Sequence, residues 1–158
     1  MLKLLLPLLP LLLGAIAAAP ADSRTIYVVR HLNTPAGATD PDLTPEGHSN
    51  AERLKDWFAG RPLDAIISSE ARRAQQTISP LAKAKGMVPR LYDPKDTAKL
   101  IAIAKERPGD ILIVGHSNTV PDIVEGLGGE RPADMPLEQL GDIWEISQGK
   151  SVRHSFVE

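Results

Sequence analysis

Three short runs of apolar residues constrain the fold of this 158-residue chain more than any other feature of its sequence. The runs are TIYVVR (25–30), LDAIISS (63–69) and ILIVG (111–115), and each is nearly continuous in apolar residues. Strands of this kind are typical of parallel sheets that helices cover on both faces. Because segments of helical character lie between the runs, the pattern favours an α/β fold with a mainly parallel sheet.

Three further segments complete the predicted sheet: VPRLY (88–92), DIWEIS (142–147) and VRHSFV (152–157). The SQG at 147–149 is typical of a hairpin turn, so the last two strands should be antiparallel, with the final one at or near a sheet edge. We therefore predict a three-layer α/β sandwich whose central sheet is mainly parallel and has an antiparallel edge.

Four helices are predicted, over about 44–58, 70–85, 95–105 and 118–127. The first begins at LTPEG, where Thr44 can cap the helix and Pro45 fits its first position. The second contains Pro80, which predicts a kink, and Gly86 directly after it is a typical helix end.

The first 21 residues differ in composition from the rest of the chain. Lys3 precedes the apolar LLLPLLPLLLGAI, and small residues follow, a pattern typical of a signal peptide. We expect cleavage after Ala21, with Ala19 as the other small residue, which leaves a domain of residues 22–158. An uncleaved anchor is the alternative, but the apolar stretch contains two prolines and is shorter than the roughly 20 residues that span a bilayer.

Composition and charge limit the compartments and partners to be expected. The chain has no cysteine, so disulfides, thiol chemistry and a lipid-anchored cysteine are excluded. We expect an exported protein, periplasmic or secreted, that is monomeric by default and not stably inserted in a membrane. The net charge of −2 argues against nucleic acid as a partner. No motif predicts a metal or a cofactor.

Polar side chains follow the predicted strands at Arg30 and His31, at residues 68–73, at Asp93, and at His116 and Ser117. In open α/β sheets, ligands bind at this carboxyl edge. The paired N–H donors of an arginine guanidinium fit two oxygens of a phosphate, and a neutral histidine can attack phosphorus. Because Arg30 disfavours the charged form of its neighbour His31, the pair indicates phosphate chemistry with a neutral nucleophile.

The segments VVRH, SSEARRAQQT and VGHSNT resemble, in this order, the three signatures of the histidine phosphatase superfamily, also called the phosphoglycerate mutase-like family. The resemblance covers nearly the whole predicted domain and implies a phosphoglycerate mutase-like fold. It implies that Arg30 and His116 bind phosphate and that His31 becomes phosphorylated. It also places the second phosphate-binding arginine at Arg73, whereas helical phase alone does not distinguish Arg73 from Arg72.

Three positions depart from the family pattern or fit it loosely. Leu32 replaces the usual Gly or Ala and is expected to narrow the mouth of the pocket, and Asn33 stands where Glu or Gln is common. The resemblance implies a proton donor just before the fourth strand, for which Asp93 is our choice, with Asp96 as the alternative. Asp93 could instead be a helix cap.

Only residues 93–110 separate the third and fourth strands, so there is no room for the cap domain of larger relatives. The chain therefore resembles the short, capless branch that includes SixA-type phosphohistidine phosphatases. The resemblance implies metal-independent hydrolysis of a phosphomonoester or phosphohistidine through a phosphohistidine on His31. An open site would admit a phosphorylated small molecule or a phosphoprotein.

Two alternatives remain at this point. A phosphate-binding module of the same fold could have kept the pocket but lost turnover, since Leu32, Asn33 and the acid depart from the pattern. Alternatively, GHSNT resembles part of the serine hydrolase nucleophile elbow, with Ser117 as nucleophile and His154 as base, but Thr119 replaces its final glycine. A mutase is less favoured, because no cap would shield the phosphoenzyme from water.

Overall fold

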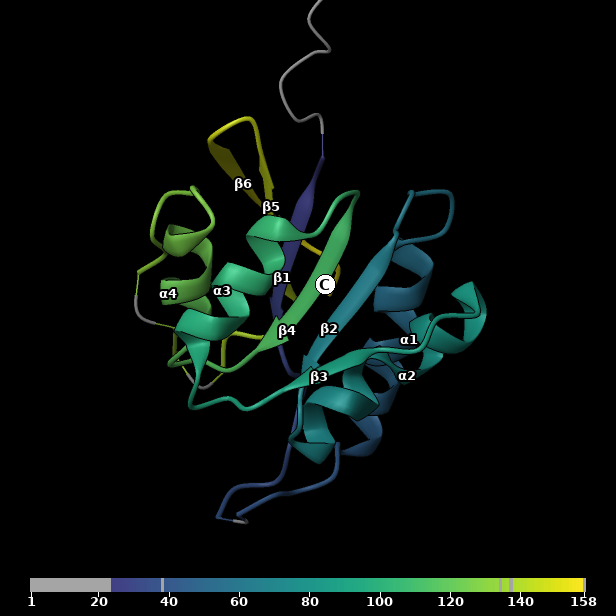
Figure 1. The fold of residues 1–158 in the computed structure, drawn as a ribbon. Helices are drawn as coiled ribbons and strands as arrows, with labels where there is room; N and C mark the ends of the chain where they lie inside the picture. Colours follow the sequence, from purple (N-terminus) through teal and green to yellow (C-terminus); the bar gives the residue numbers. More distant parts are fainter. Residues whose placement is uncertain (1–23, 38, 134, 137, 158) are drawn as a thin grey trace, which may run out of the picture.

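A computed structural model describes residues 24–37, 39–133, 135, 136 and 138–157, so the predicted signal peptide lies outside the described residues. The elements are β1 (Ile26–Arg30), α1 (Pro45–Trp57), β2 (Ala65–Ser69), α2 (Arg72–Lys85), β3 (Arg90–Tyr92), α3 (Thr97–Glu106), β4 (Ile111–Gly115), α4 (Val120–Gly126), β5 (Asp142–Ser147) and β6 (Lys150–Ser155) (Figure 1). Within the described residues, none of the helices combines the length and apolarity needed to cross a membrane.

The strands form one six-stranded sheet in the order β3-β2-β4-β1-β5-β6. The four strands from β3 to β1 are parallel, whereas β5 pairs antiparallel with both β1 and β6. Every residue of β1, β2 and β4 is buried, as their continuous apolar runs predict. The mainly parallel sheet with an antiparallel edge is therefore confirmed, and β6 lies at that edge.

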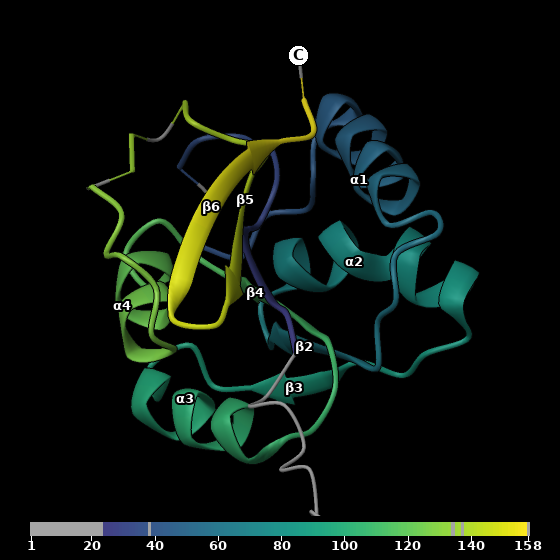
Figure 2. The same ribbon diagram turned by 90° about the horizontal axis from the view of Figure 1, so that it is seen from above.

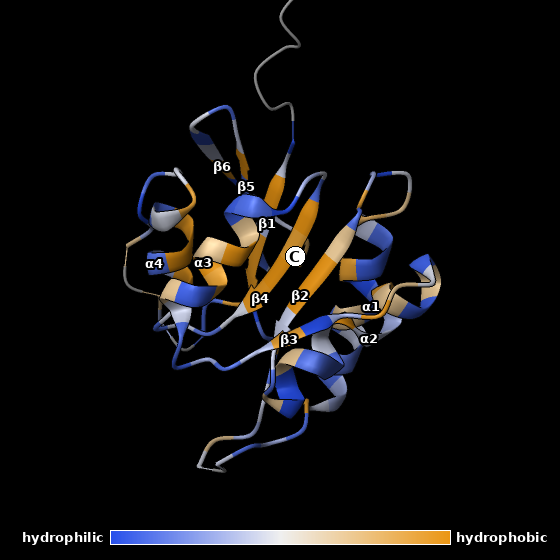
Figure 3. Cartoon of the chain, in the orientation of Figure 1, coloured by the Kyte–Doolittle hydropathy of each residue, from blue (hydrophilic) through white to orange (hydrophobic). Residues whose placement is uncertain are grey.

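The two faces of the sheet are covered by different helix pairs (Figure 2). On one face, Leu54 of α1 and Leu81 of α2 pack in one core with Val29 of β1. On the other, Leu100 of α3 and Ile123 of α4 pack in a second core that includes the neighbouring β1 residue, Val28. Because successive strand residues point to opposite faces, each central strand contributes to both cores. The result is the predicted three-layer sandwich, with apolar strands inside and polar helix surfaces outside (Figure 3).

Local signals explain where several elements begin and end. The Thr44 hydroxyl accepts a hydrogen bond from the Gly47 N–H at 3.1 Å and caps α1, which begins at Pro45. Helix α2 is continuous through Pro80 and ends at Gly86, which has a φ of 63°. The β5–β6 hairpin turns at Gln148 and Gly149, and both have positive φ, as a type I′ turn requires.

Candidate active site

Adjacent parallel strands place two histidines side by side. Arg30 ends β1, His31 follows it, and the His31 N–H donates to the carbonyl of Gly115, the last residue of β4, at 3.0 Å. His116 comes next in the chain, and the centroids of the two histidine rings are 5.3 Å apart. The pairing of β1 with β4 therefore brings together two residues that lie far apart in the sequence.

One cavity of about 460 Å³ is lined by all four predicted phosphate-site residues, Arg30, His31, Arg73 and His116. The loop after β1 forms much of its rim, and Ser117 and Asn118 also line it. A larger groove of about 560 Å³ lies between α2 and residues 87–91 but contains none of the four residues. The chemistry, rather than the size, identifies the smaller cavity as the candidate active site.

His31 is buried and held in a defined tautomer. Its Nδ1 lies 2.9 Å from the carbonyl oxygen of Leu32, and because a carbonyl only accepts, Nδ1 carries the proton. Burial, reinforced by Arg73 and Arg30 and opposed by the bond to Leu32, lowers the pKa of His31 to about 4. At neutral pH the ring is therefore uncharged, with its lone pair on Nε2, as a nucleophile requires.

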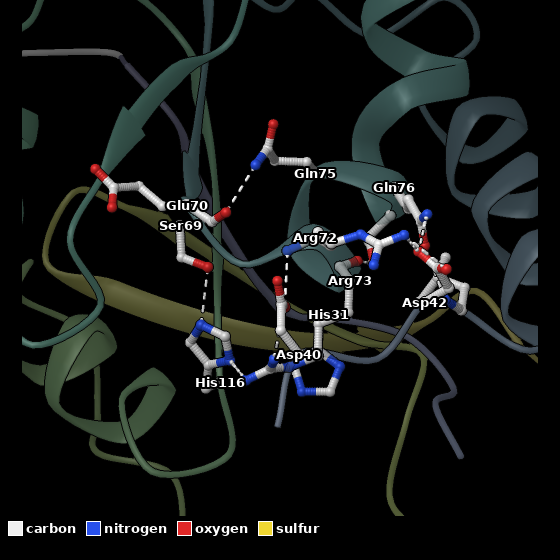
Figure 4. Close-up of polar contacts among 12 residues, drawn as sticks. His31, Asp40, Asp42, Ser69, Glu70, Arg72, Arg73, Gln75, Gln76 and His116 are labelled. Atoms are coloured by element: carbon white, nitrogen blue, oxygen red, sulfur yellow. Dashed lines mark hydrogen bonds and ion pairs between the residues drawn. The ribbon is translucent and has the colours of Figure 1, made fainter. Parts of the chain in front are cut away.

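His116 uses both ring nitrogens in polar contacts (Figure 4). Its Nδ1 is 3.1 Å from Nη2 of Arg73, and its Nε2 is 2.8 Å from the hydroxyl of Ser69. The Thr119 hydroxyl accepts a hydrogen bond from the backbone N–H of His116 at 2.9 Å. Burial, reinforced by Arg73 and by His31, lowers the pKa of His116 to about 4. The second histidine is thus also neutral at pH 7 and firmly held.

Arg30 is oriented by a loop that sequence analysis did not connect with the site. Its buried guanidinium donates from Nη1 to the carbonyl oxygens of Pro136 at 3.0 Å and Gln139 at 3.3 Å, both between α4 and β5. Burial lowers the pKa of Arg30, while Glu138 opposes this effect. No sequence signal marks these partners, because the contacts use backbone carbonyl groups.

The two neighbouring arginines of α2 lie in different surroundings. The Arg73 side chain is 21% exposed, contacts His116, and lies 3.4 Å from Asp40 through Nη1. The Arg72 side chain is 59% exposed and pairs with Asp42 at 2.6 Å. The structure therefore places Arg73, and not Arg72, in the cavity. Asp40 was not singled out from sequence, since it follows no predicted strand.

A family model described as "Histidine phosphatase superfamily (branch 1)" matches residues 26–95, which include Arg30, His31 and Arg73. This match covers less than half of the chain and shows a similarity to that superfamily. No curated protein matches the sequence.

Solved structures of several phosphatases share the fold. The protein histidine phosphatase SixA, complexed with tungstate, is 18% identical with a TM-score of 0.65, over 84% of this chain and 97% of that one. A candidate phosphohistidine phosphatase SixA from Agrobacterium tumefaciens is 23% identical, with a TM-score of 0.63, over 86% and 97%. Phosphoserine phosphatase from Entamoeba histolytica, in complex with 3-phosphoglyceric acid, is 19% identical with a TM-score of 0.62, over 85% and 97%. The chain therefore shares the fold of known phosphatases over most of its length.

The predicted proton donor lies outside the cavity that contains His31. The carboxylate of Asp93 accepts the N–H of Lys95 at 2.9 Å, and that of Asp96 caps α3 through the N–H of Lys99 at 3.1 Å. Both carboxylates line a separate cavity of about 230 Å³ between β3 and α3. Among the described residues, no Asp or Glu lines the cavity that contains His31. The role of Asp93 as proton donor is untested, and its place in a separate cavity argues against it.

The two residues that follow His31 and depart from the family pattern, Leu32 and Asn33, have structural roles. The Leu32 side chain is fully buried in a cluster with Leu43 and Ala51, and the residue also lines the cavity, so the narrowing of its mouth stays a prediction. Its N–H donates to the Thr77 hydroxyl at 3.0 Å. The Asn33 side chain accepts from Asn50 at 3.0 Å and thereby ties the loop to α1.

The remaining candidates from sequence are not gathered in the cavity. Ser117 lines it, but His154 lies on β6 beside Glu145 at 3.1 Å and Trp57, and does not line the cavity with Ser117. A serine hydrolase pair is therefore not formed. Within the described part of the chain, no three His, Asp or Glu side chains are grouped so that they could hold a metal ion.

Proposed function

We propose that the protein is a metal-independent phosphatase that hydrolyses a phosphomonoester or phosphohistidine through a phosphohistidine formed on His31. The observation that carries the proposal is the tautomer of His31: Nδ1–H is bound to Leu32, so the lone pair is on Nε2 in a cavity lined by Arg30, Arg73 and His116. A phosphate in that cavity would meet a nucleophile and fixed donors together.

The proposed reaction has two displacements. Nε2 of His31 attacks phosphorus as the bond to the leaving group breaks, and the leaving group acquires a proton. A water molecule then attacks the phosphohistidine, returns the lone pair to Nε2 and releases inorganic phosphate. Arg30, Arg73 and His116 would bind the equatorial oxygens in both steps. The loss of one such preorganised donor typically costs on the order of a hundredfold to a thousandfold in rate.

The side chains around the cavity favour substrates whose leaving group departs easily. Within the described residues, no carboxyl group lines the cavity to supply a proton to a departing alkoxide. Aryl phosphates and phosphohistidine depend less on such a donor than alkyl phosphates do. This observation supports phosphohistidine as a substrate class, in line with the SixA-type proteins that share the fold.

We also infer the setting in which the enzyme acts. The signal peptide predicted at residues 1–21 supports export to the periplasm or the medium, and the absence of cysteine is compatible with either. A phosphorylated small molecule or a phosphoprotein would be the substrate, and a monomer is the default state.

The test uses p-nitrophenyl phosphate between pH 4 and 8 with EDTA present. The purified domain should release nitrophenol, whereas His31→Ala should lose at least about a thousandfold in kcat, because the nucleophile is removed. His48→Ala, which changes an exposed histidine on α1, is the matched control and should retain full activity. No turnover by a folded wild-type protein that binds phosphate would favour the binding module instead.

A further inference from the structure

Ser69 is the buried partner of His116. It ends β2, has no exposed surface, and places its hydroxyl 2.8 Å from Nε2 of His116. Strand β2 pairs with β4 up to Ser68 and Val114, so the backbone ladder positions Ser69 beside the residue that follows β4. The contact is therefore built by the sheet and not by a flexible loop.

The hydrogen bonds of the free site fix the tautomer of His116. A guanidinium only donates, so Nδ1 accepts from Nη2 of Arg73 across the 3.1 Å contact. In a neutral ring the proton is then on Nε2, which donates it to the Ser69 hydroxyl across the contact drawn in Figure 4. It follows that Nδ1, the nitrogen beside Arg73, has no proton to offer an oxyanion.

A bound oxyanion would change which protonation state of His116 the surrounding charges favour. Arg73 from α2, together with His31 and Arg30 from the end of β1, disfavours a positive charge on the ring, while Asp40 in the loop after β1 favours it. Burial is the largest cause that, together with these charges, holds the pKa of His116 at about 4 in the free site. A dianion within hydrogen-bond distance strongly favours imidazolium. The ring can then donate from Nδ1 to the anion while Nε2–H stays on Ser69.

We propose that Ser69 is a positioning residue of the site: its hydroxyl holds Nε2–H of His116, so that an oxyanion binds at Nδ1 together with one proton taken up from solvent. The proton forms a new N–H bond at Nδ1, and the hydrogen bond from Arg73 to Nδ1 is exchanged for bonds to the anion. The inference rests on the proposed role of His116 in phosphate binding. It adds Ser69 to the residues of the site and one proton to the binding step.

The test is calorimetry of tungstate binding at pH 7 in buffers that differ in heat of ionisation, which counts protons taken up. Tungstate is a dianion at this pH and carries no proton of its own. All variants are made in His31→Ala, so that His31 cannot contribute. Ser68→Ala is the matched control, because Ser68 is the neighbouring, equally buried serine and donates to the Ser69 carbonyl, with no bond to His116.

We expect an uptake of about one proton in His31→Ala and in its Ser68→Ala derivative. The Ser69→Ala derivative should take up close to none and bind tungstate about tenfold more weakly or worse, because an imidazolium would leave Nε2–H buried without an acceptor. A neutral ring protonated on Nδ1 would then be favoured. Thermal unfolding of the two serine variants shows whether both are folded.

Two results would overturn the inference: no proton uptake in His31→Ala, or the same uptake and affinity in the Ser69→Ala and Ser68→Ala derivatives. If folded His31→Ala and wild-type proteins both failed to bind tungstate, the anion site itself would be refuted. Normal tungstate binding without nitrophenol release by the wild type would instead contradict only the proposed hydrolysis. The two failures are therefore distinguishable.

Discussion

Arg72 and Arg73 are adjacent in the chain, yet only Arg73 lies against His116. We expect Arg73→Ala to lower kcat/KM for p-nitrophenyl phosphate by about a hundredfold to a thousandfold, because a fixed donor to the phosphoryl group is lost. Arg72→Ala removes an exposed pair with Asp42 and should stay within about threefold of wild type. The reverse ranking would place the phosphate against the other arginine.

Asp93 can be tested as the proton donor with two leaving groups. A donor acts mainly on a poor leaving group, so its loss should slow an alkyl phosphate far more than p-nitrophenyl phosphate. Because the Asp93 carboxylate is bonded to Lys95 N–H in a separate cavity, we expect Asp93→Asn to have a small and equal effect on both substrates. Asp96→Asn tests the alternative carboxylate in the same way. A selective loss on the alkyl phosphate would establish the role implied by the family resemblance.

Single residues differ in how well sequence predicts their place. Arg30, His31 and His116 could be located because each follows an apolar strand whose carboxyl end faces the ligand. Ser69 belongs to the polar run at 68–73, which did not show that it contacts a histidine, and Asp40 was not singled out. Their partners lie 47 and 33 positions away in the chain, and only the assembled sheet and loops bring them into contact.

At the scale of elements, α1 supports the loop that forms the rim of the cavity. Gly47 lies so close to this loop that a Cβ atom there would be 2.5 Å from the backbone oxygen of Asn33. Since a backbone atom cannot move aside cheaply, Gly47→Ala should lower the free energy of unfolding by about 1–3 kcal/mol. Activity should fall as well, because Asn33 lines the cavity.

Urea unfolding and p-nitrophenyl phosphate turnover measure both effects of Gly47→Ala. His48→Ala, at the next and exposed position of α1, should change stability by no more than about 0.5 kcal/mol. If the two variants were equally stable, the loop after β1 would move away from the added Cβ atom without lowering the free energy of unfolding.

Element boundaries were predicted best where burial is complete. The apolar runs located β1 and β4 to within one residue, because every position in them is covered, whereas β2 begins two residues later than its run. Strand β3 is shorter than predicted, since Val88 is 94% exposed and pairing begins only at Arg90. Helix α4 starts two residues later than expected because residues 117–119 form a turn, closed by the Thr119 N–H on the His116 carbonyl.

For the whole molecule, the two buried histidines link folding to pH. The pKa values of His31 and His116 are about 4 in the folded protein against 6.5 when unfolded, so the unfolded chain binds more protons between these values. The free energy of unfolding should therefore be unaffected by these groups above pH 6.5 and should fall as the pH drops from 6.5 toward 4. The loss is about 2 kcal/mol for each histidine at pH 5.

Urea unfolding at pH 7 and pH 5 measures this loss. The His31→Ala variant should show a shallower decline, because one of the two groups is removed. Saturating tungstate should reduce the decline further if His116 is protonated in the complex. A stability that does not change between pH 7 and pH 5 would contradict the neutral state of both rings.

The hydrogen bond from the His31 N–H to Gly115 joins the candidate nucleophile to the middle of the sheet through the backbone. An amide in this position exchanges with solvent deuterium only when the surrounding sheet opens. The His31 amide should therefore be among the slowest in the protein to exchange, together with those of β4. The arrangement of the site would then persist until the whole protein unfolds. On heating, enzymatic activity and the protection of the core amides from deuterium exchange should therefore be lost in a single step.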